Sequence, residues 1–352
     1  MNTLSSLNAD RRTFLRGAAF VGMAAALPTW LLTACATSPA PVTAGSTGGL
    51  TAVKATHGTG LCNLSFFLTK EKDFADGVDL QFVVTPTNAD IVTLFGSGQV
   101  DVSLIPYTQF MTLADKGAPI KIVAGGGVQG CVITAQEGIN DAKDLKGKTL
   151  GTFQADTLEM LPYDYLKKAG LSFADVKVTY FGTSPELAQA FMSGSIDSMC
   201  HIEPFATQAL SSTKGSVKLS DGTDVYGPGY TDCVLAVSES MLKRNRDAVK
   251  SIIRGMMRGQ QLEEQNGSAA VAATAASYFK TSEAVVLDAS KKQPSVVDQR
   301  DKQQFMLDRA VNLKELNYIR ALPNKDIFDW SLLEEVISEN APLYQSLALK
   351  SA

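Results

Sequence analysis

The sequence predicts an α/β fold of two lobes, each a mainly parallel sheet flanked by helices. Three observations predict it: β-rich runs alternate with helical patterns from residue 50 to 237, one strand-helix unit occurs twice, and only helical patterns follow residue 238. Alternating strands and helices are typical of parallel sheets with crossover helices. The chain of 352 residues, 45% hydrophobic and 19% charged, is long enough for one large or two medium cores.

The N-terminus carries the pattern of an export signal. Arg11 and Arg12 precede Thr13-Phe14-Leu15 and an apolar run over residues 17–32. Adjacent arginines before such a run are typical of twin-arginine signals. A retained membrane helix is the weaker alternative, because the run is Gly/Ala-rich, contains proline and falls short of the roughly 20 apolar residues of a span. We interpret residues 1–34 as a signal peptide.

The signal ends in Leu32-Thr33-Ala34-Cys35, which resembles the lipobox of bacterial lipoproteins. An ordinary cleavage site beside a chance cysteine is the alternative. Residues 36–49 contain only Ala, Thr, Ser, Pro, Val and Gly, a composition typical of a flexible tether. We therefore expect lipidation at Cys35, a tether over 35–50, and a periplasmic protein anchored to a membrane by lipid after twin-arginine export. Which membrane leaflet holds the anchor stays open.

Four further cysteines are Cys62, Cys131, Cys200 and Cys233. They form no CxxC pair, and the two histidines lie far apart, so the spacing predicts no metal site and no cofactor. Disulfides persist in the periplasm, but twin-arginine export carries folded proteins, so bridges and free thiols both remain open. The net charge of -4 without a basic stripe predicts no binding to nucleic acid.

The expected elements follow in order. In the first set, strands at 53–56, 80–85, 100–105 and 120–124 alternate with helices at 64–73, 89–97 and 107–116. In the second, strands at 132–135, 149–153, 176–181, 198–202 and 217–219 alternate with helices at 157–169, 185–193 and 204–211. A strand at 233–237 precedes helices at 239–245, 247–265, 268–279, 283–290, 301–316 and 329–346. These last helices have no sheet of their own, so we expect them to cover the first lobe.

A repeat relates the two sets. Thr87 and Thr183 precede a helix, and the helices end in Phe95-Gly-Ser-Gly-Gln-Val-Asp101 and Phe191-Met-Ser-Gly-Ser-Ile-Asp197, all with an offset of 96 residues. Each copy starts with a capping residue, Asn88 or Ser184, and ends at a glycine suited to a left-handed turn. An economical helix-to-strand turn is the alternative to duplicated lobes. Duplicated lobes would aim two helix N-termini at a shared cleft, where open α/β sheets bind ligands.

Three phrases carry a family resemblance: Gly98-Gln-Val-Asp-Val102, Asp144-Leu-Lys-Gly-Lys-Thr-Leu-Gly151, and Gly194-Ser-Ile-Asp197 followed by Glu203-Pro-Phe205. With them, residues 51–260 resemble the periplasmic binding proteins of the nitrate, sulfonate and taurine (NitT/TauT) import family, whose fold thiamine-pyrimidine binding proteins share. The resemblance implies a two-lobed type II periplasmic binding protein with C-terminal helices on lobe 1. It also implies a hinge near 126–132 and 228–234, with lobe 1 at 51–127 plus 234–352 and lobe 2 at 128–233.

The same resemblance implies a function without catalysis. The protein would act as a monomer, capture a small sulfonate- or taurine-like or thiamine-precursor-like solute, and deliver it to an ABC permease with a separate ATPase subunit. One alternative is an enzyme related to thiamine-pyrimidine synthesis, although such enzymes carry a histidine- and cysteine-rich run that is absent here. Another is a sensor or adaptor that presents a solute to a membrane receptor.

Candidate ligand-binding residues lie at strand ends and helix starts around the expected cleft. His201 and Glu203 point the same way from one strand, so the carboxylate could accept from an amine; a capping Glu203 and a packed His201 are the alternative. The pocket loops carry no arginine, which favours a neutral or singly charged solute. The predicted residues are His57, Thr59, Asn88, Tyr107, Phe153, Asp156, Thr183, Ser184, His201 and Glu203.

Two loops qualify that prediction. Residues 125–130 match GxGxxG, but a β run follows where a dinucleotide site needs a helix, so permissive hinge glycines are the better interpretation. The loop over 57–63 lacks the glycine and proline-aromatic phrase that many relatives carry. The sequence therefore leaves the identity of the solute open.

Overall fold

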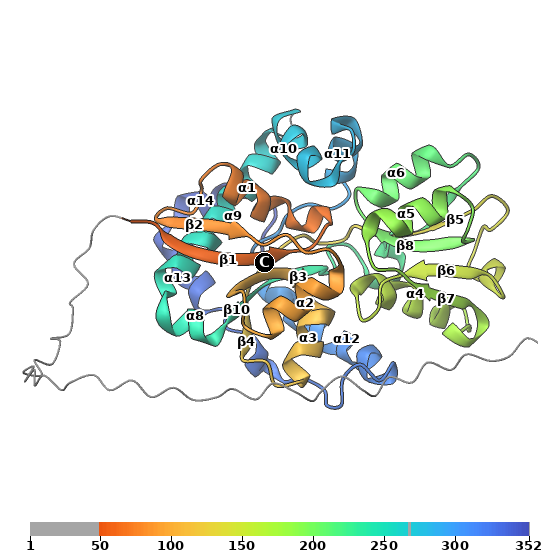
Figure 1. The fold of residues 1–352 in the computed structure, drawn as a ribbon, viewed down its shortest axis with the longest axis horizontal. Helices are drawn as coiled ribbons and strands as arrows, with labels where there is room; N and C mark the ends of the chain where they lie inside the picture. Colours follow the sequence, from red (N-terminus) through yellow and green to blue (C-terminus); the bar gives the residue numbers. More distant parts are fainter. Residues whose placement is uncertain (1–48, 267–268, 352) are drawn as a thin grey trace, which may run out of the picture. The chain divides into compact units, whose positions relative to one another are not determined.

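The computed structural model describes residues 49–266 and 269–351, which form two five-stranded sheets flanked by helices (Figure 1). The first sheet has the order β2-β1-β3-β10-β4 and the second the order β7-β6-β8-β5-β9. In each sheet four strands run in one direction, while β10 or β5 is antiparallel to both of its neighbours. The prediction of two mainly parallel sheets with flanking helices is confirmed.

The strands lie close to their predicted positions. Those of the first sheet are β1 (Thr51–His57), β2 (Val78–Phe82), β3 (Val102–Pro106), β4 (Ile120–Gly125) and β10 (Cys233–Ser238). Those of the second sheet are β5 (Cys131–Ala135), β6 (Thr149–Thr152), β7 (Lys177–Tyr180), β8 (Ser198–Ile202) and β9 (Val217–Ser220). Because β10 follows every strand of the second sheet, the chain passes between the sheets twice. The division into lobes at 127 and 233 and the hinge there stay predictions.

Helices between the strands complete each layer. They are α1 (Leu64–Glu71), α2 (Asn88–Gly96), α3 (Tyr107–Asp115), α4 (Thr157–Lys168), α5 (Ser184–Met192), α6 (Phe205–Ser212) and α7 (Thr223–Tyr226). Short 3-10 turns are η1 (Leu61–Asn63), η2 (Lys143–Leu145), η3 (Phe173–Asp175), η4 (Arg300–Lys302) and η5 (Lys325–Ile327). The turns and α7 were not expected, because elements of three or four residues leave no periodic signal.

The last part of the described chain is helical. It contains α8 (Glu239–Arg244), α9 (Arg246–Asn266), α10 (Ala269–Phe279), α11 (Glu283–Ser290), α12 (Gln303–Glu315), α13 (Ser331–Glu339) and α14 (Ala341–Ser346). Helices α9 and α13 share a buried core with the first sheet, whereas α11 also contacts α6 beside the second sheet. The helix predicted over 329–346 is two helices that meet at Asn340, because Pro342 begins the second.

The repeat corresponds to matching local structure in both sheets. Thr87 accepts a hydrogen bond from the Asp90 backbone N–H at the start of α2, and Thr183 does the same for Glu186 at the start of α5. The predicted caps Asn88 and Ser184 are instead the first residues of these helices, so each cap lies one residue earlier than predicted. Each acidic side chain accepts from the backbone N–H of its threonine, which completes a capping box. Both units end at a left-handed glycine, Gly98 or Gly194, with φ of 73° and 74°.

No helix within residues 49–266 and 269–351 is long and apolar enough to cross a membrane. The predicted signal peptide and Cys35 lie outside the described residues.

Candidate functional site

A narrow cavity lies where segments of the two sheets meet. Thr59 and Asn88, which follow strands β1 and β2 of the first sheet, line one side. Asp156 and Ser184, which follow strands β6 and β7 of the second sheet, line the other side. Its free volume is about 30 Å³, room for a water-sized group. Two wider clefts of about 540 and 610 Å³ adjoin it, and Asn88 lines all three spaces. A molecule can therefore be contacted from both sheets at once.

The two halves of the repeat meet at this cavity. The Asn88 backbone N–H, at the start of α2, donates to the Gly182 carbonyl just before α5, with N and O 3.3 Å apart. The hydroxyl oxygens of Thr59 and Ser184 lie 2.6 Å apart and share a hydrogen bond. Both helix N-termini thus lie at the wall of the cavity, where the positive ends of their dipoles favour hydrogen-bond acceptors of a ligand.

Two buried carboxyl groups, Asp156 and Asp232, also line the cavity. Asp156 caps α4 by accepting from the Leu158 backbone N–H at 3.1 Å, and it accepts from Gln109 Nε2 at 2.8 Å. The Thr157 hydroxyl oxygen lies 2.5 Å from Asp232 Oδ1 and 3.2 Å from Asp156 Oδ1. One threonine therefore links the two acids.

Burial disfavours the charged forms of Asp156 and Asp232. Burial, and then the nearby charge of Asp232, raises the pKa of Asp156 to about 7. Burial also raises the pKa of Asp232 above its ordinary range. No lysine or arginine lines the cavity within the described part of the chain. The acids thus share a low-dielectric space with no cation, a setting that favours a ligand supplying N–H donors or positive charge.

The four described cysteines, Cys62, Cys131, Cys200 and Cys233, are buried free thiols. Burial raises the pKa of the Cys62 thiol to about 12 and raises the pKa of the other three well above their usual value. Cys62 and Cys233 line the cavity. Neutral thiols thus form part of its wall at neutral pH.

Glycines allow the chain to pass close to this wall. A Cβ on Gly127 would lie 2.5 Å from Cys62 Cα, so only glycine fits where the segment from β4 to β5 crosses η1. The Gly127 N–H donates to the Cys62 carbonyl at 2.9 Å. After Gly130, strand β5 begins at Cys131, so the GxGxxG phrase precedes a strand and lacks the helix of a dinucleotide site.

Several predicted residues lie outside the central cavity. Phe153 lines the cleft of about 610 Å³, and Thr183 lines the cleft of about 540 Å³. His57 packs against the rings of Phe67 and Phe82, with both centroid distances 4.7 Å. Tyr107 is buried in the core beside the first sheet. The structure thus brings Thr59, Asn88, Asp156 and Ser184 together and leaves the others at the openings or in the core.

His201 and Glu203 hold backbone groups near the cavity. The His201 ring stacks on Phe205 and donates from Nε2 to the Ser184 carbonyl at 2.9 Å, while burial lowers the pKa of His201 to about 4. Glu203 accepts from the backbone N–H and the hydroxyl of Thr207, both at 3.0 Å. The two side chains occupy the packed and capping arrangements that were the alternative to ligand contact. Their contact with a solute stays a prediction.

Two residues of the cavity wall, Gln109 and Asp232, were not predicted from the sequence. Asp232 directly precedes the last predicted strand and lies in the predicted hinge segment, so its position at a strand end was a usable signal. Gln109 lies in the first turn of α3, and only the fold brings it to Asp156.

Comparisons with known proteins agree with this architecture. A family model described as NMT1/THI5 like matches residues 64–269. A 4-amino-5-hydroxymethyl-2-methylpyrimidine phosphate synthase of Schizosaccharomyces pombe is 30% identical over 149 residues, 40% of this chain and 41% of the relative. A putative binding protein of Brucella abortus is 28% identical over 190 residues, 54% of this chain and 59% of the relative. The matches thus cover about two fifths of the length of the synthase and about three fifths of the length of the Brucella protein.

A solved structure shares the fold over most of the chain. The periplasmic aliphatic sulphonate binding protein of Escherichia coli superimposes with a TM-score of 0.67 at 19% identity, covering 79% of this chain and 92% of that one. At this identity the likeness supports the fold and leaves the ligand open.

Proposed function

The chain belongs to the NMT1/THI5-like family, and on that premise we propose that it is the solute-binding component of an ABC-type importer. It captures a small organic solute and delivers it to a permease whose ATPase is a separate chain. The observation that carries the proposal is the cavity lined by Thr59 and Asn88 on one side and by Asp156 and Ser184 on the other. Sites between two such units suit reversible capture of small molecules.

The proposed place of action is the periplasmic face of a membrane. Arg11 and Arg12 followed by an apolar run support twin-arginine export, and Cys35 before a Gly/Ser/Pro-rich stretch supports a lipid anchor. The anchor keeps the binding protein near its permease, which raises its effective concentration there.

We propose an amine-bearing solute, such as an aminopyrimidine, in preference to a simple sulfonate. The central cavity offers the carboxyl groups of Asp156 and Asp232 and no lysine or arginine in the described wall. An amine donates to both acids, whereas a sulfonate would bring a further negative charge into a buried space that already holds acidic groups and no cation in its described wall. The cavity of about 30 Å³ is smaller than a pyrimidine ring, so entry requires the walls to separate and then close on the solute.

A second candidate function is catalysis, favoured by the 30% identity to the pyrimidine phosphate synthase over 149 residues. An enzyme would change its pyrimidine, whereas a binding protein releases it unaltered. Mass spectrometry of the solute after prolonged incubation separates these functions.

Calorimetric titration tests the proposed solute class. We expect saturable one-to-one binding of 4-amino-5-hydroxymethyl-2-methylpyrimidine and none of ethanesulfonate at matched concentration. Pyrimidine lacking the amino group is the matched control and should bind at least about tenfold more weakly, because the acids then lose a hydrogen-bond donor. Tighter binding of ethanesulfonate would overturn the amine proposal.

A further inference from the structure

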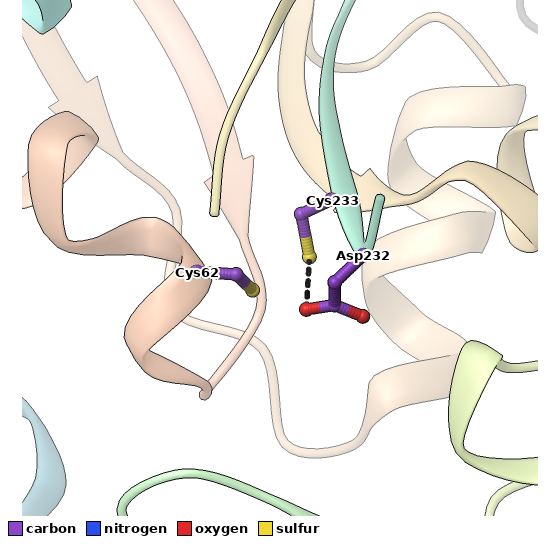
Figure 2. Close-up of side chains that lie close together, drawn as sticks. All are labelled: Cys62, Asp232 and Cys233. Carbon is purple, nitrogen blue, oxygen red and sulfur yellow. Dashed lines mark hydrogen bonds between the residues drawn. The ribbon is translucent and has the colours of Figure 1, made fainter. Parts of the chain in front are cut away.

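Three potential ligand atoms converge at one wall of the cavity. Cys62 Sγ, Cys233 Sγ and an oxygen of Asp232 lie within 4.8 Å of one another, and all three residues are buried. Figure 2 shows the Cys62 side chain, on η1, aimed at Asp232 and Cys233, which lie side by side at the start of β10. Cys233 Sγ donates to Asp232 Oδ2 at 3.3 Å. The cluster thus joins segments that are about half the chain apart in sequence.

We propose that Cys62, Cys233 and Asp232 bind a thiophilic metal ion, Zn²⁺ by its chemistry, with a fourth coordination position open to the cavity. Two thiolate sulfurs and one carboxylate oxygen are a donor set that Zn²⁺ accepts in tetrahedral geometry, and binding releases the two thiol protons to solvent. Bonds of about 2.0–2.3 Å place tetrahedral ligand atoms roughly 3.3–3.8 Å apart, so small side-chain shifts from the present spacing suffice. Three protein ligands and an open position distinguish a reactive or ligand-binding ion from a closed structural one.

Neighbouring groups hold the three ligands in place. Gln293 Nε2 donates to Asp232 Oδ2 at 3.0 Å, and the Thr157 hydroxyl donates to Oδ1 at 2.5 Å. Asn63 Nδ2 donates to Cys62 Sγ at 3.2 Å. Outer hydrogen bonds of this kind orient metal ligands and tune their affinity.

The backbone near the cluster is equally constrained. The N–H groups of Gly126 and Gly127 donate to the carbonyls of Cys233 and Cys62, both at 2.9 Å. The crossing segment therefore ties the backbone of one cysteine to that of the other. This bracing limits the rearrangement needed when an ion binds.

The open position faces the cavity because Cys62, Asp232 and Cys233 all line it. Its free volume of about 30 Å³ accommodates a water or one donor atom of a solute as the fourth ligand. The site does not depend on the transport function, although it shares Asp232 with the proposed amine site. The ion and an amine should therefore compete.

Cobalt spectroscopy on the reduced full-length chain carrying Cys35→Ala tests the site. We expect one Co²⁺ per chain, thiolate-to-cobalt charge-transfer absorption, and loss of that absorption when Zn²⁺ is added. Cys62→Ser and Cys233→Ser should each weaken metal binding at least about 100-fold. Loss of a hydrogen-bond partner of a ligand already weakens metal affinity by up to about 100-fold, and each cysteine is itself a direct ligand. Cys200→Ser, another buried thiol, is the matched control and should bind within about twofold of the parent. Absence of charge-transfer absorption, or equal loss in Cys200→Ser, would overturn the site.

A second measurement needs no cysteine variant. Zn²⁺ alone should slow native-state alkylation of Cys62 and Cys233 and leave the rates at Cys131 and Cys200 unchanged, as read by peptide mass spectrometry. Equal rates with and without Zn²⁺ would contradict the site. If cobalt binds as expected and the aminopyrimidine does not, the metal site stands and the proposed solute class fails.

Discussion

Gln109 donates from Nε2 to Asp156 Oδ2 at 2.8 Å, which joins helix α3 beside the first sheet to the cap of helix α4 beside the second. Asp156 thus does three things: it caps a helix, it links the two sheets, and it lines the cavity with an acid whose pKa is about 7. A solute that donates to Asp156 competes with Gln109 for this carboxyl group. Solute binding and the contact between the sheets are therefore coupled at one residue.

Asp156→Asn should weaken binding of the aminopyrimidine. The substitution keeps the shape and removes the acid, so the expected loss is about 1.5–3 kcal/mol, the contribution of a hydrogen bond to a charged group, or at least about tenfold in affinity. Calorimetry measures it. Glu263→Gln is the control, because burial raises the pKa of Glu263 to about 7 as well, yet Glu263 does not line the cavity. Similar affinities for both variants would contradict the proposed role of Asp156.

Asp156 should also make stability depend on pH. Burial raises the pKa of Asp156 to about 7 in the folded chain from its ordinary value of 3.8, so between these values the folded state binds more protons than the unfolded state. The free energy of unfolding should therefore fall as pH rises from 4 to 7, by up to about 4 kcal/mol from this group. Urea unfolding of Asp156→Asn should show a flatter decline than the wild type. An unchanged slope would show that Asp156 ionises normally.

Gly127→Ala should destabilise the fold. Its new Cβ would lie 2.5 Å from Cys62 Cα and 2.8 Å from Cys62 Cβ, and overpacking of this kind costs about 1–3 kcal/mol. Denaturant unfolding measures the loss. Gly182→Ala is the control, because the nearest atom to its Cβ would be a flexible glutamate oxygen at 3.4 Å. Equal stability of the two variants would refute the close packing of the crossing segment on η1.

The N-terminal predictions are tested by cell fractionation. Cys35→Ala should be exported but recovered in the soluble periplasmic fraction, because the thiol that would carry the lipid is gone. Replacing Arg11 and Arg12 together by lysine should leave precursor in the cytoplasm if the twin-arginine route is used. Unchanged membrane recovery of Cys35→Ala would refute the anchor, and normal processing of the double lysine variant would refute the route.

Local signals made most of the fold predictable. The glycines Gly98 and Gly194 mark the ends of their helices directly, and the helix starts were predicted to within one residue, since Thr87 and Thr183 cap the helices that Asn88 and Ser184 were expected to cap. The alternation of strands and helices then defines two mainly parallel sheets.

The site was less predictable, because it depends on contacts between distant segments. Asp156 could be placed at a helix start from sequence alone, but its partner Gln109 is 47 residues away. The hydrogen bonds of Glu203 were also not visible in the sequence: Thr207, four residues later, donates its backbone N–H and its hydroxyl to the carboxylate, and contact of Glu203 with a solute stays a prediction. Cys62 and Cys233 form a cluster only because η1 and the start of β10 meet in the folded chain.

Native mass spectrometry of protein purified without unfolding shows whether the acidic cavity holds an amine-bearing solute. We expect one bound amine-bearing molecule per wild-type chain, whose exact mass identifies it, and a bare chain for Asp156→Asn prepared in the same way. Glu263→Gln should retain the molecule. A wild-type chain that carries a sulfonate, or an Asp156→Asn chain that retains the amine at wild-type occupancy, would contradict the claim that this acidic cavity captures the solute.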